Sequence, residues 1–147
     1  MKPMRHLPKK LAVLPVVLLF STIMASGTGP EGEISALVRQ RTDAMNEYFC
    51  GQIPYKEAAE RIEQAETGRL LNEDLTAMRD FFQTDIEEIT DYKIKAVDIT
   101  DIDETLICAV VTIEWELYGT NGKEHMEEIY SVIAQKQENS YKLVQFF

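Results

Sequence analysis

The stretch "WELYGTNGKEHMEEIYSV", Trp115–Val132, decides the fold of this chain. Two runs of alternating apolar and polar residues flank an Asn-Gly pair at Asn121–Gly122. This arrangement predicts a β-hairpin, because both central positions of its tight turn require a positive φ, which Asn and Gly tolerate best. The chain is therefore expected to contain an antiparallel sheet whose register can be written down from this turn.

The predicted register places one ionisable residue on an apolar face. With Asn121–Gly122 as the loop, Trp115 lies opposite Glu128, and both point toward the core. The same face pairs Leu117 with Met126, Ile113 with Tyr130, Val111 with Val132 and Ala109 with Ala134. Trp115, Glu128 and Tyr130 are thus the candidate ligand pocket, and Glu128 is the candidate catalytic residue. In the alternative interpretation, Glu128 lies at an open rim and reaches solvent past Trp115.

Outward from this hairpin, the sequence predicts four strands preceded by three helices. Strands are expected from Thr90 to Ile99, over Leu106–Gly119, from His125 to Lys136, and in the closing "YKLVQFF". The alternation of the first of these slips near Val97, which indicates a bulge or a strand buried on both faces near its end. Apolar residues at helical spacing predict helices from Glu33 to Gly51, from Pro54 to Gly68 and from Leu70 to Gln83, the last with a stripe of Leu71, Leu75, Met78, Phe82 and Ile86. We therefore expect an α+β fold, with three N-terminal helices packed on a four-stranded antiparallel meander in a cone-like arrangement.

The N-terminal residues 1–27 have the pattern of an export leader. Four basic residues precede the apolar run "LAVLPVVLLFSTIM", Leu11–Met24, and the small residues "ASG" follow it. Cleavage is expected after Ala25 or Gly27, and an uncleaved membrane anchor is the alternative. In both cases residues 28–147 form a single domain that is secreted or otherwise extracytoplasmic.

The remaining chain is strongly acidic. Residues 1–27 hold four of the 15 basic residues and none of the 25 acidic ones, so residues 28–147 carry a formal net charge of −14. This charge argues against nucleic-acid binding and against electrostatic attachment to a membrane surface, which leaves an uncleaved leader as the expected membrane contact. Cys50 and Cys108 are expected as two small side chains in the interior, with a disulfide as the alternative.

The chain resembles the nuclear transport factor 2-like superfamily, also called cystatin-like α+β, and in particular its small exported bacterial members. The resemblance lies in "AMNEYFCGQIPYKEA", Ala44–Ala58, and in the closing "NSYKLVQFF". It implies a cone whose mouth binds a small molecule or is filled as core. The strand that such domains usually place between the second and third helices is missing here. The protease-inhibitor loop of cystatins and the motifs of the enzymes with this fold are also missing.

The sequence contains no complete set of catalytic or metal-binding residues. After the leader, His125 is the one histidine, so neither a nucleophile with its base nor a zinc site is predicted. The acidic run around Asp101–Glu104 lacks the glycine and the final glutamate of a helix-loop-helix calcium loop, so a solvated hairpin tip is expected. No cofactor and no metal are predicted.

Two functions from different classes follow. The first is a non-enzymatic domain of the cell envelope that binds or assembles with a protein or a small ligand. The alternative is a small-molecule enzyme in which Glu128 is the general base, with its pKa raised by apolar neighbours. A homodimer through the second sheet face is also predicted, from the apolar residues Val110, Ile133, Val144 and Phe146.

Overall fold

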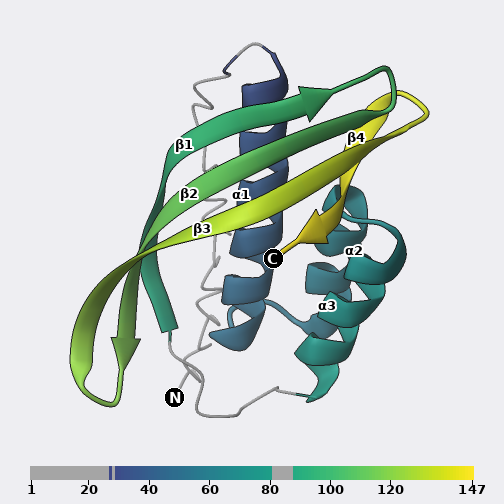
Figure 1. Ribbon diagram of the computed structural model, residues 1–147. Coiled ribbons are helices and arrows are strands. Elements are labelled where there is room, and N and C mark those ends of the chain that lie inside the picture. The colour runs from purple at the N-terminus through teal and green to yellow at the C-terminus, as the bar shows by residue number, and fades with distance from the viewer. Residues whose placement is uncertain (1–26, 28, 81–87) are drawn as a thin grey trace, which may run out of the picture.

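The computed structural model describes residues 27, 29–80 and 88–147. The expected leader, apart from Gly27, and the expected helical positions Phe81–Gln83 and Ile86 lie outside the described residues. The elements are α1 (Pro30–Phe49), α2 (Tyr55–Ala65), α3 (Gly68–Asp80), β1 (Glu88–Ile102), β2 (Leu106–Gly119), β3 (Gly122–Gln137) and β4 (Ser140–Phe146). The strands form one open antiparallel sheet in the order β1-β2-β3-β4, with helices on one side (Figure 1). This is the predicted α+β architecture.

The helices end where the sequence interrupts them. Gly51 has a φ of 71° and its N–H donates to the carbonyl of Tyr48, so a left-handed glycine terminates α1. Pro54 directly precedes α2, where its missing N–H costs no helical hydrogen bond. Gly68, with a φ of 65°, separates α2 from α3.

The register of the central hairpin differs from the predicted one by two residues. Gly119 pairs with Gly122, so Trp115 lies opposite Met126, and Glu128 lies opposite Ile113. Gly122 has a φ of 94°. Asn121 does not have a positive φ, because Glu138 is the one described non-glycine residue that does. The Asn-Gly pair therefore does not form the expected turn with two positive φ angles. A shift by two residues preserves the face of every side chain, so Glu128 still lies on the side of the helices.

A bulge in β4 changes which residues lie on the outer sheet face, where a dimer was predicted. The two-residue turn before β4 is present, with Gln137 opposite Ser140, but the register shifts between Ile133 and Ala134. Beyond this shift the alternation of β4 reverses, since one extra residue is inserted in the strand. Phe146, which was predicted on the outer face, packs against the core, and Gln145, which was predicted on the inner face, lies opposite Ile133.

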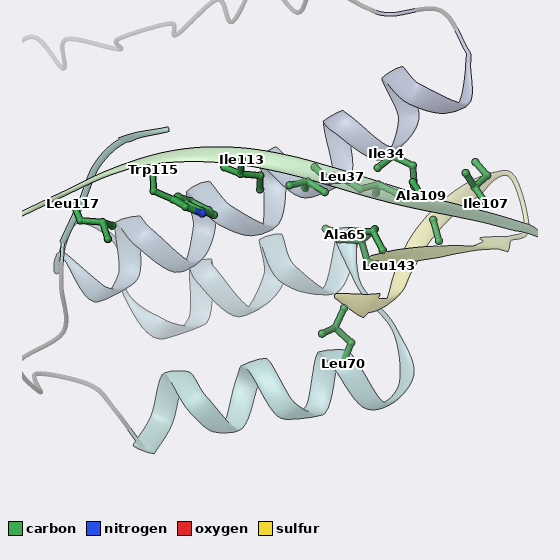
Figure 2. Close-up of a cluster of buried hydrophobic side chains, with 14 residues drawn as sticks. Ile34, Leu37, Ala65, Leu70, Ile107, Ala109, Ile113, Trp115, Leu117 and Leu143 are labelled. Carbon is green, nitrogen blue, oxygen red and sulfur yellow. The ribbon is translucent and has the colours of Figure 1, made fainter. Parts of the chain in front are cut away.

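The core lies between α1 and the inner face of the sheet. Ile34, Leu37 and Val38 of α1 pack against alternate residues of β2, and Leu143 of β4 and Leu70 of α3 belong to the same cluster (Figure 2).

The bulge predicted near Val97 is present in β1, between Ile94 and Ala96.

The helices also share a smaller core. Tyr48 of α1 and Ile62 of α2 pack there with Met78 of α3. The buried positions of α3 are Leu70, Asp74 and Met78, so the predicted stripe through Leu71 and Leu75 is rotated by about one residue, and its centre is an acid.

Candidate functional site

A cavity of about 570 Å³ opens between α1 and the inner face of the sheet. Its wall comes from α1, from the start of β1, from the turn ends of β2 and β3, and from the last two residues of the chain. The lining residues are Arg41, Thr42, Met45, Asn46, Phe49, Ile89, Trp115, Leu117, Met126, Glu128, Tyr130, Phe146 and Phe147. The volume falls in the range of small-molecule sites, and apolar and aromatic side chains make up most of the wall, as is usual for such sites.

The three side chains predicted for the pocket lie together in this cavity. Trp115 is buried, with 8% of its surface exposed, and its Nε1–H donates to the hydroxyl of Tyr130 at 3.1 Å. The Tyr130 hydroxyl in turn donates to the Glu128 carboxylate. Glu128 itself is exposed at the rim. The apolar enclosure on which the general-base alternative depends is therefore not present around this carboxylate.

The hydroxyl of Tyr130 is a donor at neutral pH. Burial, and then the hydrogen bond and charge of Glu128, raise the pKa of Tyr130 to about 12. Burial and the carboxylate of Asp43, which accepts a 2.7 Å hydrogen bond from the Tyr92 hydroxyl, raise the pKa of Tyr92 as well. Both phenols therefore stay protonated and donate to a carboxylate, Tyr130 in the cavity wall and Tyr92 outside it.

A row of four aromatic rings runs along the inner face. Tyr92 contacts Trp115 at 5.6 Å between ring centroids, Trp115 meets Tyr130 edge-on at 6.2 Å, and Tyr130 stacks on Phe146 at 4.6 Å. The guanidinium of Arg41 lies 4.4 Å from the centroid of Phe146 at one end of this row. These contacts pack the rings against one another, and three of the four, Trp115, Tyr130 and Phe146, line the cavity.

Arg41 also holds a buried acidic pair beside the cavity. Its Nη2 lies 2.7 Å from Asp74 Oδ2, and its Nε lies 2.8 Å from both Asp74 Oδ2 and Glu66 Oε1. The Nε–H is directed at Asp74, so neither oxygen of the fully buried Glu66 accepts a well-aligned hydrogen bond from the described residues. Burial and the neighbouring Asp74 raise the pKa of Glu66 to about 8, against the opposing effect of Arg41.

One buried hydroxyl in the cavity wall has no partner among the described residues. Thr42 is 5% exposed and lines the cavity, and its Oγ1 makes no hydrogen bond there. Asn46, one turn further along α1, donates from its side-chain nitrogen to the carbonyl of Ile89 at 2.9 Å. Buried polar groups in folded proteins almost always have a partner, so the unpaired hydroxyl of Thr42 behind the cavity wall is an exception.

Other residues considered from the sequence have structural roles or stand alone. Asp103 Oδ1 accepts hydrogen bonds from the N–H groups of Thr105 and Leu106, which lowers the pKa of Asp103 and fixes the hairpin tip.

Cys50 and Cys108 are both free and half-buried, so the disulfide alternative is wrong. No group of three or more His, Cys, Asp or Glu side chains within the described residues could hold a metal ion. In the same part of the chain, no helix is long and apolar enough to cross a membrane.

Comparison with known proteins supports the fold. No protein-family model matches this chain, and no curated protein matches it. Among solved structures, the intermembrane space region of the chloroplast protein ARC6 is similar, with a TM-score of 0.50 and 11% sequence identity. The alignment covers 81% of this chain and 95% of that chain. At this identity the similarity concerns the arrangement of the helices and strands alone.

Sequence reasoning missed several residues of the site. Arg41, Glu66 and Asp74 lie on three separate segments, and no local pattern marks them as partners. Phe146 was predicted on the outer face of the sheet. The bulge in β4, at the register shift between Ile133 and Ala134, places it on the inner face instead.

Proposed function

We propose that this chain is a non-enzymatic binding domain that works outside the cytoplasm and takes its ligand in the cavity beside α1. The observation that carries the proposal is the open cavity of about 570 Å³, whose wall of aromatic and apolar side chains also holds the polar groups of Asn46 and Glu128. A cavity that served as plain core would be filled by side chains.

The extracytoplasmic location rests on the sequence. Basic residues, a short apolar run and small residues precede the domain in the order of an export leader. The similar ARC6 region is described as part of an intermembrane space, and the proposed location of this chain agrees with that description. Membership of the nuclear transport factor 2-like superfamily belongs to the same proposal, since its cone-shaped domains use a comparable mouth for ligands.

Trp115 is the one tryptophan of the chain, and it lines the cavity, so it reports on occupancy directly. We would follow its indole N–H signal by NMR while adding benzyl alcohol, benzoate or benzyltrimethylammonium. At least one of these small aromatic probes is expected to shift the signal in a saturable way. If none does at millimolar concentration, the proposed cavity function is wrong.

A matched pair of variants separates the cavity from the rest of the sheet. Thr42→Met adds side-chain volume at the cavity wall, so it is expected to weaken probe binding. Thr112→Met makes the same substitution on a half-buried residue of the outer face, opposite Ile129, and is expected to leave binding unchanged. Equal loss in both variants would indicate a general change in the sheet rather than a ligand site.

The export part of the proposal has its own test. Expression of the full chain in a bacterium, followed by mass spectrometry of the protein outside the cytoplasm, is expected to give an N-terminus after Ala25 or Gly27. An intact N-terminus in the membrane fraction would indicate the anchor instead. Recovery of the uncleaved chain from the cytoplasm alone would contradict both.

A further inference from the structure

The strand β3 is paired along only part of one side. It spans Gly122–Gln137, and β4 pairs with it from Val132 to Gln137. From Gly122 to Tyr130, the described residues supply no strand on that side, and Figure 1 shows the β2–β3 hairpin extending well past β4. An unpaired strand edge offers a row of backbone donors and acceptors to another extended chain.

The last backbone hydrogen bonds that β3 makes on the side of β4 show which of its N–H and C=O groups face the open edge. Ser131 and Phe147 exchange two hydrogen bonds, with N···O distances of 2.7 and 3.1 Å. In an antiparallel ladder, every second residue directs its N–H and C=O to the same neighbour. Continuing this alternation along β3, Ile129 and Glu127 direct their backbone groups to the open edge.

This open edge borders the cavity. Met126, Glu128 and Tyr130 lie on the inner face of the unpaired part of β3, and all three line the cavity. Residues directly opposite each other in an antiparallel pair project on the same side of the sheet. A side chain placed opposite Glu128 by an added strand would therefore enter the cavity.

The charge at this edge selects a basic side chain. Glu124 lies on the same face of β3 as Glu128, four residues nearer the turn, and both are exposed. Arg41, the one cationic residue among the described residues of the cavity wall, already pairs with Glu66 and Asp74. Aromatic rings and a carboxylate together favour a cation on an apolar stem.

The same charges disfavour a second copy of this chain. Edge-to-edge pairing of two β3 strands would bring Glu124, Glu127 and Glu128 close to the same residues of the other copy, which is destabilising. The acidic balance of residues 28–147 adds a longer-range repulsion between copies and an attraction for basic partners.

We propose that the open edge of β3 binds an extended segment of a partner protein as an added antiparallel strand, with a Lys or Arg side chain opposite Glu128 in the cavity. This inference rests on the proposed binding function and names its partner. Backbone hydrogen bonds to Ile129 and Glu127 supply affinity, and the cavity supplies specificity for the basic residue, as in other cases of strand addition.

The test begins with a selection from a random decapeptide library displayed on phage, with the purified full chain as the target. Selected peptides are expected to share one Lys or Arg within an alternating β-prone sequence. A synthetic peptide from the selection would then be compared with versions that carry norleucine or Glu at the basic position. The norleucine version is expected to bind at least about tenfold more weakly, and the Glu version more weakly still.

Two variants separate the cavity from general charge. Glu128→Gln is expected to weaken the basic peptide about tenfold, whereas Glu114→Gln, which removes the same charge from the outer face of β2 opposite Glu127, is expected to change affinity less than threefold. Hydrogen exchange of the chain with bound peptide is expected to slow at the amides of Ile129 and Glu127. Ile129→Pro, which removes an N–H from the open edge, is expected to weaken binding while the strand persists.

The outcomes distinguish this inference from the proposed function. Binding of small aromatic probes with no enrichment of basic peptides would overturn the strand addition and leave the cavity function in place. Equal affinity for the norleucine peptide, or peptide binding without protection of Ile129 and Glu127, would also overturn the inference. Tight binding of benzyltrimethylammonium with no peptide binding would indicate a small amine as the ligand. Failure of every probe would overturn both proposals.

Discussion

Arg41 joins α1 to α3 through Asp74, whose Oδ2 lies 2.7 Å from Nη2 and 2.8 Å from Nε of the guanidinium. The same guanidinium stacks on Phe146 in the cavity wall. The stability of the helical layer and the shape of the cavity are therefore connected through one side chain. Asp74→Ala leaves Arg41 next to the raised-pKa Glu66 without its principal acceptor.

We expect Asp74→Ala to lower the free energy of unfolding by about 2 kcal/mol, because the largely buried guanidinium of Arg41 loses its hydrogen bonds to Asp74 and keeps only Glu66 as an acidic neighbour. Urea denaturation monitored by circular dichroism would measure this. Glu73→Ala is the control, since Glu73 forms an exposed pair with Arg69 on the same helix and should change stability by less than about 0.5 kcal/mol. Similar losses in the two variants would contradict the role given to Arg41.

The buried Glu66 predicts a fall in stability with rising pH. Its pKa is raised from 4.5 to about 8, so between these values the folded chain holds a proton that the unfolded chain releases. Stability falls with pH wherever the folded state binds more protons. The contribution of Glu66 is thus fully present below about pH 4.5 and is lost as the pH rises through about 8.

Glu66→Gln keeps the shape of the side chain and removes this titration. Between pH 5 and pH 8 the free energy of unfolding of the variant is expected to fall less than that of the wild type, because the titration of Glu66 is absent. At pH 8 the variant is expected to be the more stable protein. Urea unfolding at one-unit pH intervals would test this. Parallel stability curves for the two proteins across that range would show that Glu66 does not carry the proton.

The hydroxyl of Tyr130 connects Trp115 to Glu128, and its removal tests that connection. We expect Tyr130→Phe to lower the free energy of unfolding by about 1 kcal/mol, because the indole N–H of Trp115 loses its acceptor in a buried site. The indole N–H signal of Trp115 should also shift and exchange faster with solvent. Tyr118→Phe, on an exposed residue of β2, should leave both observables unchanged.

The sequence predicted the sheet face of Glu128 but not that of Phe146, for a physical reason. A side chain keeps its face when the register slips by two residues, so Trp115, Glu128 and Tyr130 were grouped correctly although the predicted turn was wrong. Phe146 was misplaced because a single inserted residue reverses the alternation after it. Arg41 and Asp74 are 33 positions apart, and a buried acid among apolar residues of a helix becomes understandable only when its partner is in place.

The outer sheet face provides the last prediction. With Phe146 on the inner side, the predicted dimer surface retains Val110, Ile133 and Val144, none of which is fully exposed. If these residues join two copies, light scattering at increasing concentration should show a dimer. Ile133→Lys should shift it to monomer, because a charge would be buried in the interface. Glu127→Lys, on the same face nearer the turn, adds a lysine outside this patch and should leave the dimer intact. A monomer at millimolar concentration would show that the half-buried outer face is simply solvated.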